Sequence, residues 1–228
     1  MADTGRIVAI VGAESTGKST LAQALATTLP GLTGWRCAWV PEVLREWSEA
    51  AGRTPRVEEQ AEIATEQARR IEAAARTHDL VLADTTPLMT AVYHHQVFGE
   101  TSLDAMALAW QRRHCETTLL TALDLPWQAD GLQRDGPQVR APVDARLRQL
   151  LVSADLPFAV VSGQGQRRTE AALDALTLLW RASFAKRQPW STGLFSRLAA
   201  RETEQPAWRG TCTDCDQPDC EHRAFQRR

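Results

Sequence analysis

Residues that could bind phosphate lie close to the N-terminus, in the segment Gly12-Ala-Glu-Ser-Thr-Gly-Lys-Ser19. This G-x-x-x-x-G-K-S spacing is typical of a loop whose backbone N–H groups surround a phosphate, with the positive end of the next helix behind it. We expect Lys18 to contact the β- and γ-phosphates of ATP and the Ser19 hydroxyl to ligate Mg²⁺. A chance glycine turn is the alternative, and the apolar run before the loop together with the helical pattern after it favours the phosphate loop.

Two carboxylates follow predicted strands, where ligands of parallel sheets bind. Glu42 comes after Val40-Pro41, and Asp84 ends the run Leu80-Val-Leu-Ala83. Asp84 either holds magnesium or accepts the proton of an attacking hydroxyl, and Glu42 is either that base or a ligand of the substrate. Both could instead be helix N-caps. Arg45, one helical turn beyond Glu42, either contacts substrate or pairs with a neighbouring glutamate.

A polar segment, residues 124–142, is rich in Asp, Gly, Pro and Arg and predicts a long loop. Arg134 and Arg140 could close on the transferred phosphate and neutralise its charge. Trp127 is a candidate substrate contact, since an aromatic ring can stack on a planar ligand. A solvated loop with an ordinary buried Trp is the alternative.

The elements that position these residues alternate between strand and helix. Short apolar runs predict strands at 6–11, 36–40, 80–83 and 158–161, and 117–123 is either a strand or the end of a helix. Helical spacing predicts helices at 18–29, 57–77, 87–97, 102–114, 143–153 and 167–186, with Pro30-Gly31 and Gly34 breaking the chain after the first. This order predicts an α/β fold of the P-loop NTPase type, with a parallel sheet of about five strands and helices on both faces.

Residues 1–188 would form this domain, and residues 189–228 lose the periodic pattern and form a tail. Cys212, Cys215, Cys220 and His222 in that tail could bind structural Zn²⁺, the alternative being free thiols on a flexible or docked tail. The three thiols crowd together rather than forming the paired pattern of a secreted disulfide framework.

The charge is nearly balanced, with 26 Lys and Arg against 28 Asp and Glu. Such a chain lacks the positive field that binding to nucleic acid or to an anionic membrane would use. No apolar run approaches the roughly 20 residues of a membrane span, and the first residues lack the layout of a signal peptide. We expect a cytoplasmic protein that binds ATP and a small substrate, and a homo-oligomer is possible.

In several blocks at once the sequence resembles the ribosylnicotinamide kinase domain of the NadR family, among AAA-type ATP-binding P-loop proteins. The similar blocks are Gly12–Thr20, Val40-Pro-Glu42 with Arg45-Glu46, Ile63-Ala64 with Gln67, Asp84-Thr85, Leu125-Pro-Trp127, Asp130-Gly-Leu132, Gly163 and Arg168. The resemblance covers roughly residues 6–180. It leaves no room before Arg6 for the further domains of larger members, so we expect a stand-alone kinase.

The resemblance implies transfer of the γ-phosphoryl group of ATP, with Mg²⁺, to the 5′-hydroxyl of nicotinamide riboside. It also implies site residues. The nucleotide set is Gly12, Ala13, Glu14, Ser15, Thr16, Gly17, Lys18, Ser19, Thr20, Gly163 and Arg168, and the substrate set is Glu42, Arg45, Asp84, Thr85, Trp127 and Asp130. The chain differs from the family pattern at Thr86, Cys115-Glu116 and Gln133. Alternatives are another small-molecule kinase, or a regulatory module that binds ATP and recruits a partner.

Overall fold

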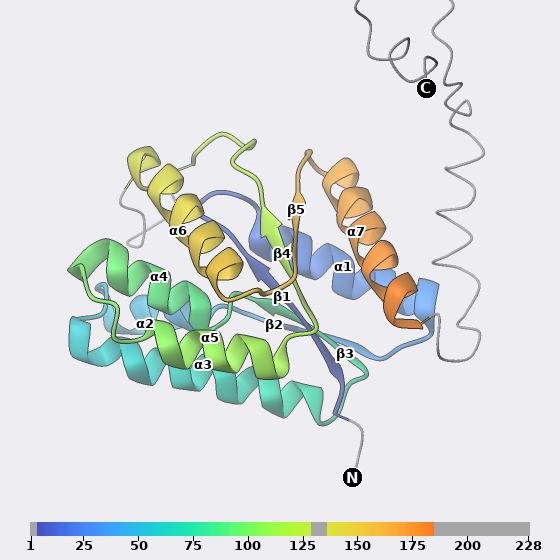
Figure 1. Cartoon of the computed structure of the whole chain (residues 1–228), viewed down its shortest axis with the longest axis horizontal. Coiled ribbons are helices and arrows are strands. Elements are labelled where there is room, and N and C mark those ends of the chain that lie inside the picture. Colours follow the sequence, from blue (N-terminus) through green and yellow to red (C-terminus); the bar gives the residue numbers. More distant parts are fainter. Residues whose placement is uncertain (1–3, 129–135, 185–228) are drawn as a thin grey trace, which may run out of the picture.

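The central sheet has five strands, all parallel, in the order β2-β3-β1-β4-β5. The computed structural model describes residues 4–128 and 136–184. Its strands are β1 (Arg6–Val11), β2 (Cys37–Val40), β3 (Leu80–Asp84), β4 (Thr117–Thr121) and β5 (Phe158–Val161). β1 lies in the centre, so the loop that follows it opens at the middle of the sheet's carboxyl edge (Figure 1).

Helices cover both faces of the sheet (Figure 1). They are α1 (Lys18–Thr33), α2 (Val43–Ala51), α3 (Gln60–Ala75), α4 (Pro87–Phe98), α5 (Asp104–His114), α6 (Arg140–Ser153) and α7 (Gln166–Phe184), with single turns η1 (Val57–Glu59) and η3 (Pro137–Val139). The predicted doubly covered parallel sheet is therefore confirmed. No helix of the described chain is both long and apolar enough to cross a bilayer.

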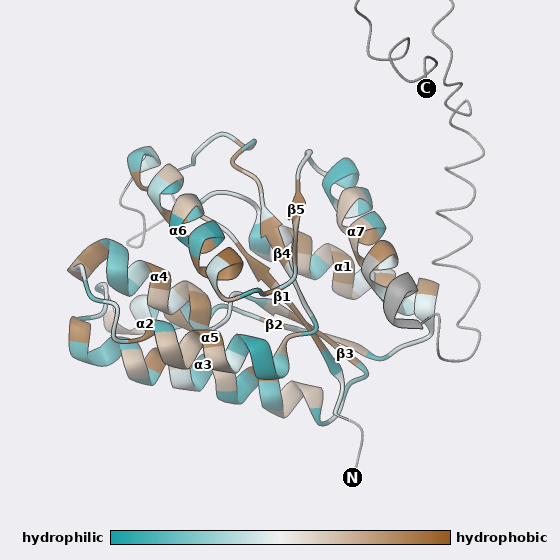
Figure 2. Cartoon of the chain, viewed as in Figure 1, coloured by the Kyte–Doolittle hydropathy of each residue, from teal (hydrophilic) through white to brown (hydrophobic). Residues whose placement is uncertain are grey.

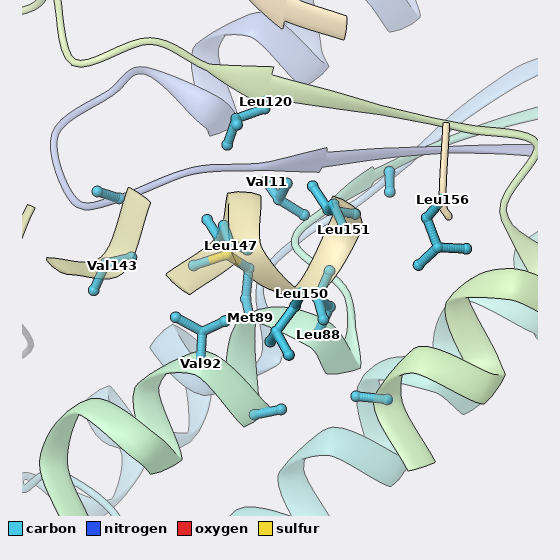
Figure 3. Close-up of a cluster of buried hydrophobic side chains, with 14 of the residues drawn as sticks. Val11, Leu88, Met89, Val92, Leu120, Val143, Leu147, Leu150, Leu151 and Leu156 are labelled. Carbon is cyan, nitrogen blue, oxygen red and sulfur yellow. The ribbon is translucent and has the colours of Figure 1, made fainter. Parts of the chain in front are cut away.

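The alternation of side chains along β1 divides the core into two layers. Val8 and Ile10 face α1 and α7. Ala9 and Val11 face the opposite side, where α4, α5 and α6 pack, and Figure 3 shows Val11 in this cluster. Ile7, on the same side, packs against α3. Side chains of a strand point alternately to the two faces, so a central strand covered on both must be apolar throughout. The brown strands between helices with teal outer surfaces show this arrangement in Figure 2.

The predicted end of the first helix is wrong. Pro30-Gly31 does not break the chain, because α1 continues through Pro30 to Thr33 and ends at Gly34, whose φ of 74° is left-handed. Proline removes one backbone donor from a helix. Here that loss falls in the last turn, where Leu29 is buried and Leu32 packs on the same core cluster, so packing outweighs the missing bond.

Two other segments were open or unassigned in the sequence. Residues 117–121 form a strand, because β4 is buried throughout between β1 and β5. Residues 43–51 form α2, and Gly52 caps its end.

The end of the predicted loop is helical. α6 begins at Arg140, within the segment expected to be a loop, and Pro142 lies in its first turn, where proline costs no helical hydrogen bond.

Candidate active site

The loop between β1 and α1 has the geometry of a phosphate cradle. Gly17 caps α1 with a left-handed φ of 75°. A Cβ atom added at Gly12 would lie 2.0 Å from Thr121 Oγ1, so no larger residue fits there. Lys18 Nζ donates to Ala13 O at 3.0 Å, which folds the lysine back over its own loop. Residues 15–20 of this loop, Lys18 among them, line one space, as phosphate binding requires.

A pair of buried threonines fixes the loop to the sheet. Thr121, at the end of β4, donates to Thr16 Oγ1 at 2.7 Å, and Thr16 donates to Ala13 O at 2.7 Å. Thr16 and Thr121 are fully buried. The shape of the loop is therefore set by the neighbouring strand as well as by its own glycines.

Arg168, in the first turn of α7, holds three loops together. Its Nε donates to Gly163 O at 2.7 Å, its Nη1 donates to Thr16 O, and its Nη2 pairs with Asp124. Asp124 also accepts from Gly163 N at 2.6 Å. Arg168 is only 4% exposed, so it braces the phosphate loop from behind, and its expected direct contact with the nucleotide stays a prediction.

The chain after β4 covers the phosphate loop. The Ser15 hydroxyl donates to Gln128 O at 3.0 Å and accepts from Gln128 N at 3.1 Å, and Arg140 Nη2 donates to Leu125 O at 2.8 Å. The space enclosed is a cavity of about 370 Å³, lined by Ser15, Thr16, Gly17, Lys18, Ser19, Thr20, Glu42, Arg45, Leu125, Pro126 and Gln128. We call it the phosphate cavity.

Asp84 lies beside the phosphate loop, at the end of β3, and is 2% exposed. Its burial raises the pKa of the carboxyl group, against the opposing effects of hydrogen bonds with Ser19 and Trp39 and the charges of Lys18 and Arg45. Asp84 Oδ1 has no hydrogen-bond partner among the described residues. A buried carboxylate oxygen next to the Ser19 hydroxyl suits a hard cation, so both residues fit the predicted magnesium site.

Glu42 takes the N-cap position of α2 but makes no side-chain capping hydrogen bond. Its side chain lines the phosphate cavity and also a second, adjoining cavity of about 190 Å³. Lys18, Arg45 and Ser15 line both cavities as well. This arrangement brings Glu42 to the boundary between the two spaces, where a base would meet an acceptor and a phosphate.

The second cavity, which we call the acceptor cavity, lies between α2, the start of α3 and α4. Beyond the four shared residues it is lined by Glu14, Leu44, Ser48, Thr54, Pro55, Gln60, Tyr93, Val97 and Phe98. Apolar and aromatic side chains form most of this part of the wall. Such a wall with a few polar groups is usual for a site that binds a small organic molecule.

Several predicted site residues lie elsewhere. Trp127 is half-buried and lines neither cavity, and Thr85 is 3% exposed with its amide bonded to Ile10 O. Asp130 and Arg134 lie outside the described residues, as do Cys212, Cys215, Cys220 and His222. Among the residues that are described, no group of His, Cys, Asp and Glu could hold a metal with three or more ligands, so the structure lends the zinc prediction no support.

Sequence reasoning missed the wall of the acceptor cavity and the braces of the phosphate loop. Ser48, Gln60, Tyr93 and Phe98 occur in ordinary helical patterns, and no motif distinguishes them. Asp124 and Thr121 follow or end β4, so inspecting polar residues at the end of that strand would have found them.

Comparisons with known proteins agree with this fold. Two NadR crystal structures, described as complexes with NAD and AMP-PNP and with NR, superpose with TM-scores of 0.60 and 0.62 at 18% and 19% identity. They cover 77% of this chain, which spans only 50% and 52% of theirs. Thymidylate kinase from Ehrlichia chaffeensis superposes with a TM-score of 0.55 at 13% identity over 77% of this chain and 99% of its own.

None of the curated proteins matches the sequence. A family model described as an AAA domain matches residues 7–168, which run from β1 to Arg168 and include every described residue of the phosphate cavity. The five-stranded parallel sheet, the phosphate loop after its central strand and this match over most of the chain agree. The chain therefore belongs to this AAA domain family of P-loop proteins.

Proposed function

We propose that the chain is an ATP-dependent kinase that phosphorylates the 5′-hydroxyl of a nucleoside, with nicotinamide riboside as the first candidate. One observation carries the proposal: a phosphate cavity and an acceptor cavity adjoin and share Ser15, Lys18, Glu42 and Arg45. A site of this kind holds a triphosphate and a small organic acceptor side by side. Bringing two reactants together in this way supplies much of the rate enhancement in phosphoryl transfer.

The proposed role of each residue follows from its position in the site. The amides of the phosphate loop and Lys18 would hold the β- and γ-phosphates and offset the negative charge that develops between them. Asp84 and Ser19 would hold Mg²⁺, which supplies further positive charge to the phosphates when bound.

Glu42 would accept the proton of the acceptor's hydroxyl. The hydroxyl oxygen then bonds to the γ-phosphorus as the bond to the bridging oxygen of ADP breaks. This assignment chooses between the two carboxylates on geometry: Glu42 lines both cavities, whereas Asp84 lines neither and is buried against Ser19. Arg45, which also lines both cavities, would contact the transferred group or the acceptor.

The similar structures support a nucleoside-like acceptor. The NadR structures are complexes with NAD and AMP-PNP and with NR, and two further similar structures are those of deoxyadenosine kinase from M. mycoides and thymidylate kinase. This chain matches about half of each NadR chain, so the activity of that whole protein carries over only as a proposal.

A coupled assay of ADP release tests the proposal, with nicotinamide riboside, other nucleosides and nucleoside monophosphates as acceptors. We expect turnover with a nucleoside, a loss of at least about a hundredfold in kcat for Lys18→Ala, and a similar loss for Glu42→Gln with ATP binding retained. ATP hydrolysis that stays at background with every acceptor would refute the kinase and favour the regulatory module. Faster turnover with monophosphates would change the acceptor class to nucleotides.

A further inference from the structure

We propose that Ser48 and Gln60, on the wall of the acceptor cavity, select an acceptor whose ring carries a neutral hydrogen-bonding group, such as a primary carboxamide, and reject a carboxylate at that place. The inference rests on the proposed function, because it names the chemistry of the molecule that enters this cavity. It assigns specificity to two residues that no sequence motif marks.

Both residues are buried, and one side-chain oxygen of each has no partner among the described residues. Ser48, on α2, is 1% exposed, and Gln60, the first residue of α3, is 4% exposed. Ser48 Oγ and Gln60 Oε1 make no hydrogen bond to any described residue, although both residues line the acceptor cavity. Buried polar atoms are normally paired, because leaving them unpaired costs free energy. A ligand that pairs with both atoms would recover that cost.

The type of partner follows from the two groups. Gln60 Oε1 accepts a hydrogen bond, and a serine hydroxyl either donates or accepts. The ligand must therefore bring a donor for Gln60, and it gains further from an acceptor for Ser48. A primary carboxamide carries an N–H donor and a carbonyl acceptor on one carbon, so it serves both. A carboxylate has no proton to donate and leaves Gln60 Oε1 unpaired.

The charges that line the acceptor cavity also favour a neutral group over an anionic one. Among the described residues, those that line the acceptor cavity alone include no lysine or arginine, and Glu14 is one of them. The cations Lys18 and Arg45 belong to the boundary shared with the phosphate cavity. An anionic group on the acceptor's ring would thus leave water without gaining a cation there, which is costly. Tyr93 and Phe98 in the same wall offer aromatic surfaces to a planar ring.

The turn that precedes Gln60 is held by hydrogen bonds and ion pairs, which restrict the backbone there before a ligand enters. Glu59, the preceding residue, pairs with Arg53 through both oxygens, at 2.7 and 2.8 Å, and accepts from Arg56 N at 2.6 Å. Ion pairs with arginine and this backbone bond lower the pKa of Glu59 to about 2, so the carboxylate stays charged at neutral pH. A preorganised group loses little entropy on binding.

The test compares three ligands that differ only at the ring: nicotinamide riboside, nicotinic acid riboside and the pyridinium riboside without a substituent. Their affinities are measured by calorimetry on the full chain with a non-hydrolysable ATP analogue, and their turnover is measured separately. We expect the wild type to prefer the carboxamide over the bare ring by roughly tenfold to a hundredfold. Gln60→Met should remove most of that preference while changing the affinity for the bare ring by less than about threefold.

Ser48→Ala should lower the preference by a smaller factor. The controls make the same two changes at exposed positions outside the site, Gln23→Met on α1 and Ser153→Ala at the end of α6. Both should leave the preference for the carboxamide unchanged. Equal losses for all three ligands in Gln60→Met would show a merely structural role and overturn the inference. Equal wild-type affinity for the carboxamide and the carboxylate would overturn it too.

Binding and turnover separate this inference from the proposed function. A carboxamide preference that depends on Gln60 but comes without phosphoryl transfer would support the inference and refute the kinase. Phosphoryl transfer to a nucleoside, with a ligand preference that Gln60→Met leaves unchanged, would support the kinase and refute the inference.

Discussion

Replacing Arg168 with methionine tests whether the buried guanidinium braces the phosphate loop. Methionine keeps the apolar stem and removes all three polar contacts: those to Thr16 O and Gly163 O and the ion pair with Asp124. The two backbone carbonyls then lose a charged donor from a position that is 4% exposed. Water reaches such a position poorly, so the lost bonds are only partly replaced.

The size of the effect follows from these contacts. Each lost hydrogen bond costs about 1 kcal/mol of unfolding free energy. The ion pair adds about 1 kcal/mol, because the Asp124 side chain is 34% exposed and solvent screens its charge. We therefore expect Arg168→Met to destabilise the protein by about 3 kcal/mol, which corresponds to a Tm lower by about 6–12 °C for a domain of this size.

Differential scanning calorimetry measures this shift, and the KM for ATP reports the loop itself. Arg167→Met is the matched control, since Arg167 is exposed in the same turn of α7 and should change the Tm by less than about 2 °C. A Tm for Arg168→Met within 2 °C of the wild type would refute the brace. A lowered Tm with an unchanged KM for ATP would show that the network stabilises α7 without shaping the phosphate loop.

Three further predictions test the site and the core. Gly12→Ala should lower the unfolding free energy by about 1–3 kcal/mol in urea, because its Cβ would lie 2.0 Å from Thr121 Oγ1, whereas Gly31→Ala, with no atom within 4 Å, should not. Asp84→Asn should remove magnesium-dependent turnover but leave ATP binding measurable by calorimetry, and loss of binding would instead make this carboxylate structural. Burial raises the pKa of Cys37 to about 11, so about one thiol in a thousand is ionised at pH 8, and mass spectrometry should show far slower alkylation in the native than in the unfolded chain.

Most of the sheet could be predicted because its strands are short apolar runs that are followed by glycine, proline or a polar residue, or end in one. The failures came where tertiary packing decides. Helix α1 passes Pro30 because buried leucines hold its last turn, and β4 forms because β1 and β5 pair with both of its edges. Neither partner is visible in a local pattern, so local propensity gave the wrong end for α1 and no decision for residues 117–121.

The candidate site divides in the same way. The phosphate loop is contiguous in sequence, and its spacing alone predicts which backbone groups face the ligand. The acceptor cavity joins α2, α3 and α4, and its polar members Ser48 and Gln60 become distinctive only because burial leaves their oxygen atoms unpaired. The phosphate loop can be predicted from sequence because its residues are contiguous. The wall of the acceptor cavity comes from three helices, so its residues can be identified only once the fold is known.

Burial also separates the two carboxylates that the sequence left as alternatives. Asp84 ends β3, next to the central strand, where desolvation raises the pKa of its carboxyl group and disfavours its charge. A cation bound at Oδ1 would stabilise the charged carboxylate. Burial keeps water away from Asp84, so this oxygen would suit a metal ion as a ligand. Glu42 follows β2 at the edge of the sheet and opens onto both cavities. The edge position gives its carboxylate the access to an acceptor's hydroxyl that a base needs, and the position beside the centre denies that access to Asp84.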